Sequence, residues 1–283
     1  MRIQWFPGHM TKAMRMMSEQ VAQVDCLICV LDCRAVSSCV NDNLVKIAGS
    51  KPILYVLNKR DLVDQGDVAA WESDFAARGK ACIATDGTGF RHRDKLIAKL
   101  KELNAPVIEK YRLKGVRKTV RAMVVGVPNT GKSTLINSLC GAKKTVTGNK
   151  AGVTRGKQWV TLSSGIELLD TPGTLPPSFE DGDKALKLAF IGSVKDDILD
   201  LVELAQEFIA FMQTHFEDAF LKRYGLEQFC EKPHETLEAV CRKRGFVLSG
   251  GVLDVERGAR AVIDDFRSGR MGKLMLDAPE VSE

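Results

Sequence analysis

The eight residues from Gly126 to Ser133, GVPNTGKS, constrain the fold of this chain more than any other segment. They match the phosphate-binding pattern G-x-x-x-x-G-K-[ST] at every fixed position. The segment follows an apolar run and precedes a helical pattern over 133–139, which is the strand–loop–helix setting that the pattern requires. Its backbone N–H groups would surround phosphate oxygens, with Lys132 near the β- and γ-phosphates and the Ser133 hydroxyl on Mg²⁺. We expect the phosphates to be bound by Asn129, Thr130, Gly131, Lys132, Ser133 and Thr134.

A second motif on the phosphate side is Asp170-Thr171-Pro172-Gly173, which ends a predicted strand over 167–170. An Asp at this place can hold Mg²⁺ through water, and the amide of Gly173 can reach the γ-phosphate and switch a loop when that phosphate leaves. Thr154, in Gly152-Val153-Thr154, lies between the two motifs and could complete the Mg²⁺ shell of the catalytic centre. The pattern around Thr154 is weak evidence alone, and only its position gives it weight.

A base-recognition motif, Asn58-Lys59-Arg60-Asp61, follows the apolar strand predicted over 52–57. The Asp61 carboxylate can accept hydrogen bonds from guanine N1–H and N2–H₂, a donor pair that adenine lacks. Lys59 can cover the base with its aliphatic stem. Thr85 and Asp86 lie where a small loop backing the base is expected, although Asp86 departs from the usual S-A-[KL] pattern. Together the motifs predict binding of GTP and GDP with Mg²⁺.

The order of these motifs indicates a circular permutation. In an ordinary GTPase the phosphate motif precedes the base motif, whereas here 58–61 precedes 126–133. Alternating strands and helices predict an α/β fold: a permuted P-loop GTPase domain over residues 1–178, with a mostly parallel sheet and helices on both faces. Residues 104–118, with Pro106 and Gly115, break this pattern and are predicted to connect two halves of one sheet. Helical periodicity after residue 178 predicts a small all-α domain over 179–283.

Charge is unevenly distributed along the chain. The formal net charge is +5, yet no Asp or Glu occurs from Lys110 to Ile166. Such a basic block is commonly a solvated face, but nucleotide phosphate accounts for little of it beyond Lys132, so RNA is a serious candidate partner. No apolar run approaches the roughly 20 residues that a membrane span needs, and we expect a monomeric cytoplasmic protein.

Two of the eight cysteines, Cys26 and Cys29, form a C-x-x-C pattern, which in some proteins binds metal or performs redox chemistry. They lie in an apolar run that predicts a buried strand, where this spacing directs the thiols to opposite faces. We therefore favour reduced thiols that behave as small hydrophobic side chains.

With the permuted order established, the chain resembles the YlqF/RbgA family of ribosome-biogenesis GTPases. The resemblance extends to the opening Trp5-Phe6-Pro7-Gly8-His9-Met10, to Asp32-Cys33-Arg34 with Ser37-Ser38, and to Gly250-Gly251 and Asp265–Gly269 near the C-terminus. It implies GTP hydrolysis coupled to late maturation of the large ribosomal subunit. It also implies a C-terminal domain that binds ribosomal RNA, and contacts with ribosomal proteins.

The catalytic group is the least defined part of the site. Where Ras-like enzymes place a water-orienting Gln, this chain has Thr174, and the family usually has a hydrophobic residue there. The family resemblance suggests that His9 supplies the missing polar group, and a structural histidine beside Pro7-Gly8 is an equal alternative. Asn129 resembles the Asn of P-loops that use K⁺ in place of an arginine finger, so K⁺ is a candidate second cation.

Other functions remain as alternatives. An RNA-modifying or small-molecule enzyme that carries a GTPase module would need a second catalytic constellation, and His215 and His234 stand apart without such spacing. A membrane-associated switch would favour a basic amphipathic tail, which the acidic stretch 277–283 opposes. The C-terminal basic residues could form an RNA face or merely solubilise helices: Arg242, Lys243, Arg244, Arg257, Arg260, Arg267, Arg270 and Lys273.

Overall fold

The computed structural model describes residues 8–87, 92–141, 145, 158–162, 165–175 and 181–279, with side chains from residue 13 onward. These residues form two compact units. The sheet unit comprises the described residues up to 175 together with 275–279, and the helical unit comprises 181–274. Residues 275–279 thus belong with the sheet unit, whereas the sequence predicted that the helical domain would continue to residue 283.

Six strands form the sheet in the order β3-β2-β1-β4-β6-β5. All neighbours are parallel except β5 and β6, which confirms the predicted mostly parallel sheet. In register, Asp32 pairs with Asn58 and Val124 with Asp170, so the carboxyl ends of the central strands meet at one edge. The strands are β1 (Cys26–Asp32), β2 (Ile53–Asn58), β3 (Ala81–Ala84), β4 (Val120–Val125), β5 (Gln158–Leu162) and β6 (Ile166–Asp170).

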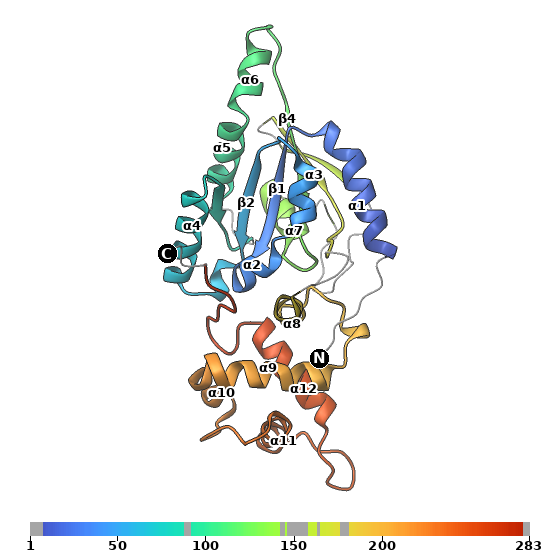
Figure 1. Ribbon diagram of the computed structural model, residues 1–283, viewed down its shortest axis with the longest axis vertical. Helices are drawn as coiled ribbons and strands as arrows, with labels where there is room; N and C mark the ends of the chain where they lie inside the picture. The colour runs from blue at the N-terminus through green and yellow to red at the C-terminus, as the bar shows by residue number, and fades with distance from the viewer. Residues whose placement is uncertain are drawn as a thin grey trace. The chain divides into compact units, whose positions relative to one another are not determined.

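Helices cover both faces of this sheet, as predicted (Figure 1). On one face, Ile28 and Val124 lie in a buried cluster with Leu100 and Ile136. On the other face, the ring of Tyr55 lies 4.8 Å from that of Phe75. The helices of the sheet unit are α1 (Gly8–Gln20), α2 (Val36–Cys39), α3 (Asp42–Ala48), α4 (Gln65–Ala77), α5 (Arg93–Leu103), α6 (Ala105–Arg112) and α7 (Lys132–Cys140).

Residues 104–118 connect the two halves of the sheet, as predicted, but the predicted break in the pattern is wrong in its first half, because α6 occupies residues 105–112. Pro106 lies in the first turn of α6, where its missing N–H leaves no hydrogen bond unmade. The proline is therefore compatible with the first turn of this helix and does not break it.

All eight cysteines are free thiols. Cys26 belongs to the core cluster that contains Ile28, and alternation along β1 places Cys29 on the opposite face. Burial raises the pKa of Cys26 to about 11 and that of Cys29 to about 12. Among the residues with described side chains, no group of three or more His, Cys, Asp or Glu could hold a metal ion. Nor does any described helix have the length and apolar character to cross a membrane.

The helical unit packs around α9, with Phe208 near the rings of Phe190 (5.1 Å) and Phe266 (4.9 Å). Gly258 is needed for the close approach of its helix to Cys241, because a Cβ there would collide with the thiol. The helices are α8 (Gly182–Phe190), α9 (Leu201–His215), α10 (Glu217–Tyr224), α11 (Pro233–Arg244) and α12 (Val255–Arg267).

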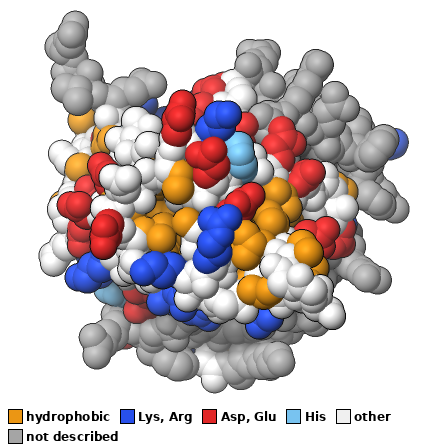
Figure 2. All heavy atoms as spheres, turned by 90° about the horizontal axis from the view of Figure 1, so that it is seen from below, with side chains coloured by type: hydrophobic (Ala, Val, Ile, Leu, Met, Phe, Trp, Pro, Cys, Tyr) orange, Lys and Arg blue, Asp and Glu red, His pale blue; other side chains and the backbone are white. Residues whose placement is uncertain are grey.

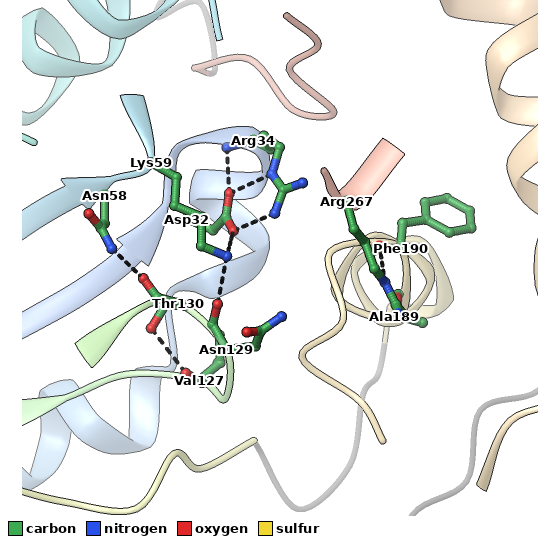
Figure 3. A network of polar contacts seen from close by, with 10 residues as sticks. All are labelled: Asp32, Arg34, Asn58, Lys59, Val127, Asn129, Thr130, Ala189, Phe190 and Arg267. Atoms are coloured by element: carbon green, nitrogen blue, oxygen red, sulfur yellow. Dashed lines mark hydrogen bonds and ion pairs between the residues drawn. The ribbon is translucent and has the colours of Figure 1, made fainter. Parts of the chain in front are cut away.

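Two residues quoted for the family resemblance, Asp265 and Arg267, have structural partners in this unit. Asp265 is buried and accepts hydrogen bonds from Arg223, Tyr224 and Arg270. Arg267 donates to the carbonyls of Ala189 and Phe190 at the end of α8 (Figure 3). It also pairs with Asp196. Arg267 and Arg270 are therefore weaker candidates for RNA contacts than the sequence indicated.

Candidate nucleotide-binding site

The phosphate loop connects β4 to α7 and has the curled backbone that its sequence predicted. Gly126 and Gly131 have φ of 146° and 90°, and Asn129 has φ of 60°, an uncommon value for a residue with a side chain. Lys132 is the first residue of α7, and its Nζ donates to the carbonyls of Gly126 (3.2 Å) and Val127 (2.8 Å). The amino end of α7, where the helix dipole is positive, and this ammonium thus both lie at the phosphate loop. Their combined positive charge favours the binding of an anion there.

Burial lowers the pKa of Lys132 to about 8, with nearby Asp170 opposing the shift. The ammonium therefore sits in an environment that disfavours its charge until an anion compensates it. A phosphate is such an anion, so a bound nucleotide would stabilise the charged form of Lys132.

The residues on the metal side of the loop lie together as the sequence predicted. Ser133 Oγ donates to Asp170 Oδ2 over 3.0 Å, and burial raises the pKa of Asp170. The other carboxylate oxygen, Oδ1, is buried without a hydrogen-bond partner among the described atoms. A hydroxyl and an unsatisfied carboxylate oxygen fit a hard cation such as Mg²⁺. Gly173 packs against Pro128 and Lys132 Nζ, where a Cβ would collide with the loop backbone.

The base motif is bonded directly to the phosphate loop (Figure 3). Asn58 Nδ2 donates to the carbonyl of Thr130 over 2.7 Å, and Lys59 Nζ donates to that of Asn129 over 2.6 Å. Lys59 itself has a left-handed backbone with φ of 59°. Asp61 is exposed, so its carboxylate is accessible to a guanine base. The structure therefore brings two motifs from opposite halves of the permuted chain into one site.

The third loop supports the base motif through its backbone. Thr85 N donates to the carbonyl of Leu57 (2.7 Å), and Arg60 N donates to the carbonyl of Thr85 (3.2 Å). The Thr85 hydroxyl accepts from Gly87 N, and Asp86 between them is half-buried. Thr85 is thus placed to shape the base-backing loop.

Other predicted residues have less definite positions. Thr134 follows Ser133 in α7 and is half-buried. Thr174 is fully buried, and its Oγ1 has no hydrogen-bond partner among the described atoms. This environment suits the hydrophobic residue usual at that place better than a group that orients water. Thr154 lies outside the described residues, and His9 is placed only as part of the backbone of α1.

Comparisons with known proteins agree with this geometry. A family model described as "50S ribosome-binding GTPase" matches residues 121–237. Ribosome biogenesis GTPase A of Bacillus cereus is 38% identical over 99% of this chain and 95% of that protein. The crystal structure of GNP-bound YlqF from T. maritima has a TM-score of 0.66 and 28% identity, covering 95% of this chain and 99% of the other. The chain belongs to the YlqF/RbgA family of GTPases. A GDP-bound structure of T. maritima YlqF gives the same TM-score and identity over 94% of this chain and 99% of the other.

Sequence reasoning assigned no role in this YlqF/RbgA-family site to Asp32 and Arg34, although it quoted both for the resemblance. Asp32 ends β1 and forms ion pairs with Arg34 (2.9 Å) and Lys59 (2.8 Å). The signal that could have identified Asp32 is its position at the end of a buried strand beside Asn58, since parallel strands bring their carboxyl ends to one edge.

Proposed function

We propose that this GTPase acts as an assembly factor that binds the precursor of the large ribosomal subunit through its RNA, promotes late maturation, and is stimulated by the subunit. The observation that carries the guanine-nucleotide part is the pair of bonds from Asn58 and Lys59 to the phosphate loop. The names of the family model and of the B. cereus relative support the ribosomal part, because they describe 50S binding and ribosome biogenesis.

The residues of the site have separable tasks in hydrolysis. Lys132 and the amino end of α7 hold the phosphates and compensate charge that develops on them during transfer. Ser133, Asp170 and Thr154 would hold Mg²⁺, which neutralises phosphate charge when bound. Gly173 lies against Lys132 Nζ, where its amide can respond to the γ-phosphate. We include K⁺ beside Asn129 in this proposal as a second source of positive charge.

A partner is needed because the usual water-orienting side chain is absent. Thr174 occupies that place, and it is buried and points its hydroxyl at no described partner. Intrinsic turnover is therefore slow, and a bound ribosomal subunit would raise it by ordering the missing group. His9 is our candidate for that group.

RNA binding is supported by the tip of the sheet unit that precedes β4. Residues Lys110, Lys114 and Arg117 are exposed there, and they form no ion pair within the described part of the chain. Arg112, Lys118 and Arg121 in the same stretch pair with acidic residues. Figure 1 shows α6 projecting beyond the sheet at the end opposite α2, so this tip is accessible to a large polyanion.

The test is GTP hydrolysis by purified protein in KCl and in NaCl, with and without large ribosomal subunits. We expect slow turnover alone, strong stimulation by subunits, and faster turnover in KCl than in NaCl. Lys132→Ala is the control, because loss of the ammonium should abolish both basal and stimulated rates.

The outcomes separate the parts of the proposal. Normal GTP binding without stimulation would remove the ribosome as activator and leave the GTPase assignment intact. Equal rates in the two salts would remove K⁺. Stimulation that His9→Ala leaves unchanged would exclude His9 as the missing group.

A further inference from the structure

The Asp32 carboxylate is fully buried at the carboxyl end of β1, outside every recognised nucleotide-binding motif. Its Oδ1 accepts from Arg34 N (3.1 Å) and Arg34 Nε (3.0 Å). Its Oδ2 accepts from Arg34 Nη2 (2.9 Å) and pairs with Lys59 Nζ (2.8 Å). One carboxylate thus holds two cations, of which only Lys59 belongs to the nucleotide site.

The charges around Asp32 fix its protonation state. Burial opposes its negative charge, but Arg34 and Lys59 together hold the pKa of Asp32 well below its usual range. The Arg34 side chain is only 2% exposed, whereas that of Lys59 is 21% exposed. Arg34 is therefore a buried anchor for the carboxylate, and Lys59 is the partner that reaches toward solvent and nucleotide.

Lys59 is held at its tip and at its backbone. The ammonium lies between Asp32 Oδ2 and the carbonyl of Asn129, and the backbone has the left-handed φ of 59°. Figure 3 shows this ammonium between the two oxygen atoms. A long lysine side chain loses considerable rotamer freedom when it is fixed in this way. Its stem is then already ordered along the surface that a guanine base would cover.

We propose that Asp32 and Arg34 are positioning residues for guanine-nucleotide binding, which act by holding Lys59 in its binding geometry. This inference rests on the proposed GTP site and adds to it a residue pair on a different strand. Asp32 is the sheet partner of Asn58, so the carboxylate supports the base motif from the neighbouring strand. Neither residue touches the nucleotide in this proposal, because each acts through Lys59.

A double-mutant cycle tests the proposal, with the dissociation constant of a fluorescent GDP as the readout. Asp32→Asn removes the anion, and Lys59→Met removes the ammonium while keeping the apolar stem. We expect each single variant to weaken GDP binding about tenfold, as for loss of one charge-assisted hydrogen bond. Adding Asp32→Asn to Lys59→Met should change the GDP affinity less than about twofold, because the Lys59 ammonium that Asp32 holds is already absent.

The matched control is Asp25→Asn. Asp25 precedes β1 at its opposite end and pairs with Lys118 over 2.8 Å, so its loss removes an ion pair from the same strand without touching Lys59. GDP affinity should stay unchanged in this variant. Additive losses in the cycle, or unchanged affinity in folded Asp32→Asn, would overturn the proposal.

Asp32→Asn leaves Arg34 buried without its anion, so this variant could unfold. The second variant is therefore Asp32→Asn/Arg34→Gln, which removes both charges together. We expect it to fold, as monitored by circular dichroism, and to bind GDP about tenfold more weakly, again by loss of the anion that orders Lys59. Wild-type affinity in the folded neutral pair would contradict the inference. Failure of the wild-type protein to bind GDP would instead contradict the proposed function.

Discussion

The Lys132 ammonium makes nucleotide affinity depend on pH in a predictable direction. Its pKa is lowered to about 8 by burial, so the free protein loses this charge as pH rises through that value. Bound phosphate favours the ammonium, and GDP binding must therefore take up a proton above pH 8. We expect GDP affinity to fall between pH 7.5 and 9.5, by up to about tenfold per pH unit. Calorimetry in buffers of different ionisation enthalpy would detect the proton.

Lys132→Ala is the control. This variant should bind GDP more weakly, and its GDP affinity should lack the pH dependence that the titration of Lys132 causes. The effect on stability has the opposite sign. Between pH 8 and the unfolded-state pKa near 10.5, the unfolded chain binds the proton that the native state has lost, so this group favours folding as pH rises. An affinity that is flat over the same range in the wild type would contradict the assignment.

Single residues in this site were predictable to the extent that their motif lies in one short segment. Lys132 and Ser133 follow from the spacing of the phosphate loop, and Asp61 follows from N-K-x-D. The role of Asp32 was not predictable in this way, because its contact with Lys59 depends on the pairing of β1 with β2. That register is set by long-range packing, and no local pattern encodes it.

At the scale of elements, the C-terminal segment acts as a strap on the sheet unit. Asp277 Oδ2 accepts hydrogen bonds from Ser37 Oγ (2.8 Å), Ser38 N (3.0 Å) and Ser38 Oγ (2.8 Å) at the start of α2. Leu276 N donates to the carbonyl of Arg34. We expect Asp277→Ala to lower the free energy of unfolding of the sheet unit by about 1–3 kcal/mol, because three donors lose their acceptor.

Urea unfolding followed by tryptophan emission is the measurement. Trp71 Nε1 donates to the carbonyl of Asp277 over 3.3 Å, so the emission of Trp71, isolated in a Trp5→Phe/Trp159→Phe background, reports the docked segment. Glu19→Ala, which removes an exposed helix-surface ion pair with Arg15 in α1, should cost less than about 1 kcal/mol. Equal losses in the two variants would show that the strap contributes no more than a surface pair.

Sequence patterns predicted regular elements better than this strap. The predicted helix over 133–139 lies within α7, and the strands predicted over 52–57 and 167–170 lie within a residue or two of β2 and β6. Ser37 and Ser38 were quoted only for a family resemblance, and nothing near Asp277 has a period or a motif. An extended segment that docks through a few hydrogen bonds has no periodic pattern or motif in its sequence, because its partners are distant along the chain.

For the whole molecule, the permuted order determines how the helical unit is attached. The chain leaves the sheet unit after the segment that contains Asp170 and Gly173, and it returns at residue 275 to the backbone of Arg34. Within the described part of the chain, these two covalent connections of the helical unit thus continue from segments that contact the nucleotide site or its supporting pair.

Where RNA would bind, under the proposed function, depends on the charges of both units. The face in Figure 2 carries basic and acidic side chains interspersed, which is typical of a solubilising surface. Several basic residues of the helical unit are paired within it, Arg223 and Arg267 among them. The exposed cations before β4 are different, because Lys110, Lys114 and Arg117 have no described ion pair. We therefore expect the tip of the sheet unit to contribute strongly to RNA affinity.

The variant Lys110→Ala/Lys114→Ala/Arg117→Ala should weaken binding to large-subunit RNA and leave GDP affinity unchanged, because the tip lies at the end of the sheet opposite the nucleotide site (Figure 1). Removing one cation that neutralises a phosphate reduces the slope of log affinity against log salt by about one, so the slope should fall by roughly two to three. Filter binding over a range of KCl concentrations measures the RNA affinity and this slope.

Arg78→Ala/Lys99→Ala, which removes two cations that form local ion pairs at i,i+4 and i,i+3 spacing, is the control. An unchanged slope in the triple variant would move the RNA contacts to the helical unit, where Lys243 and Arg260 are exposed on α11 and α12.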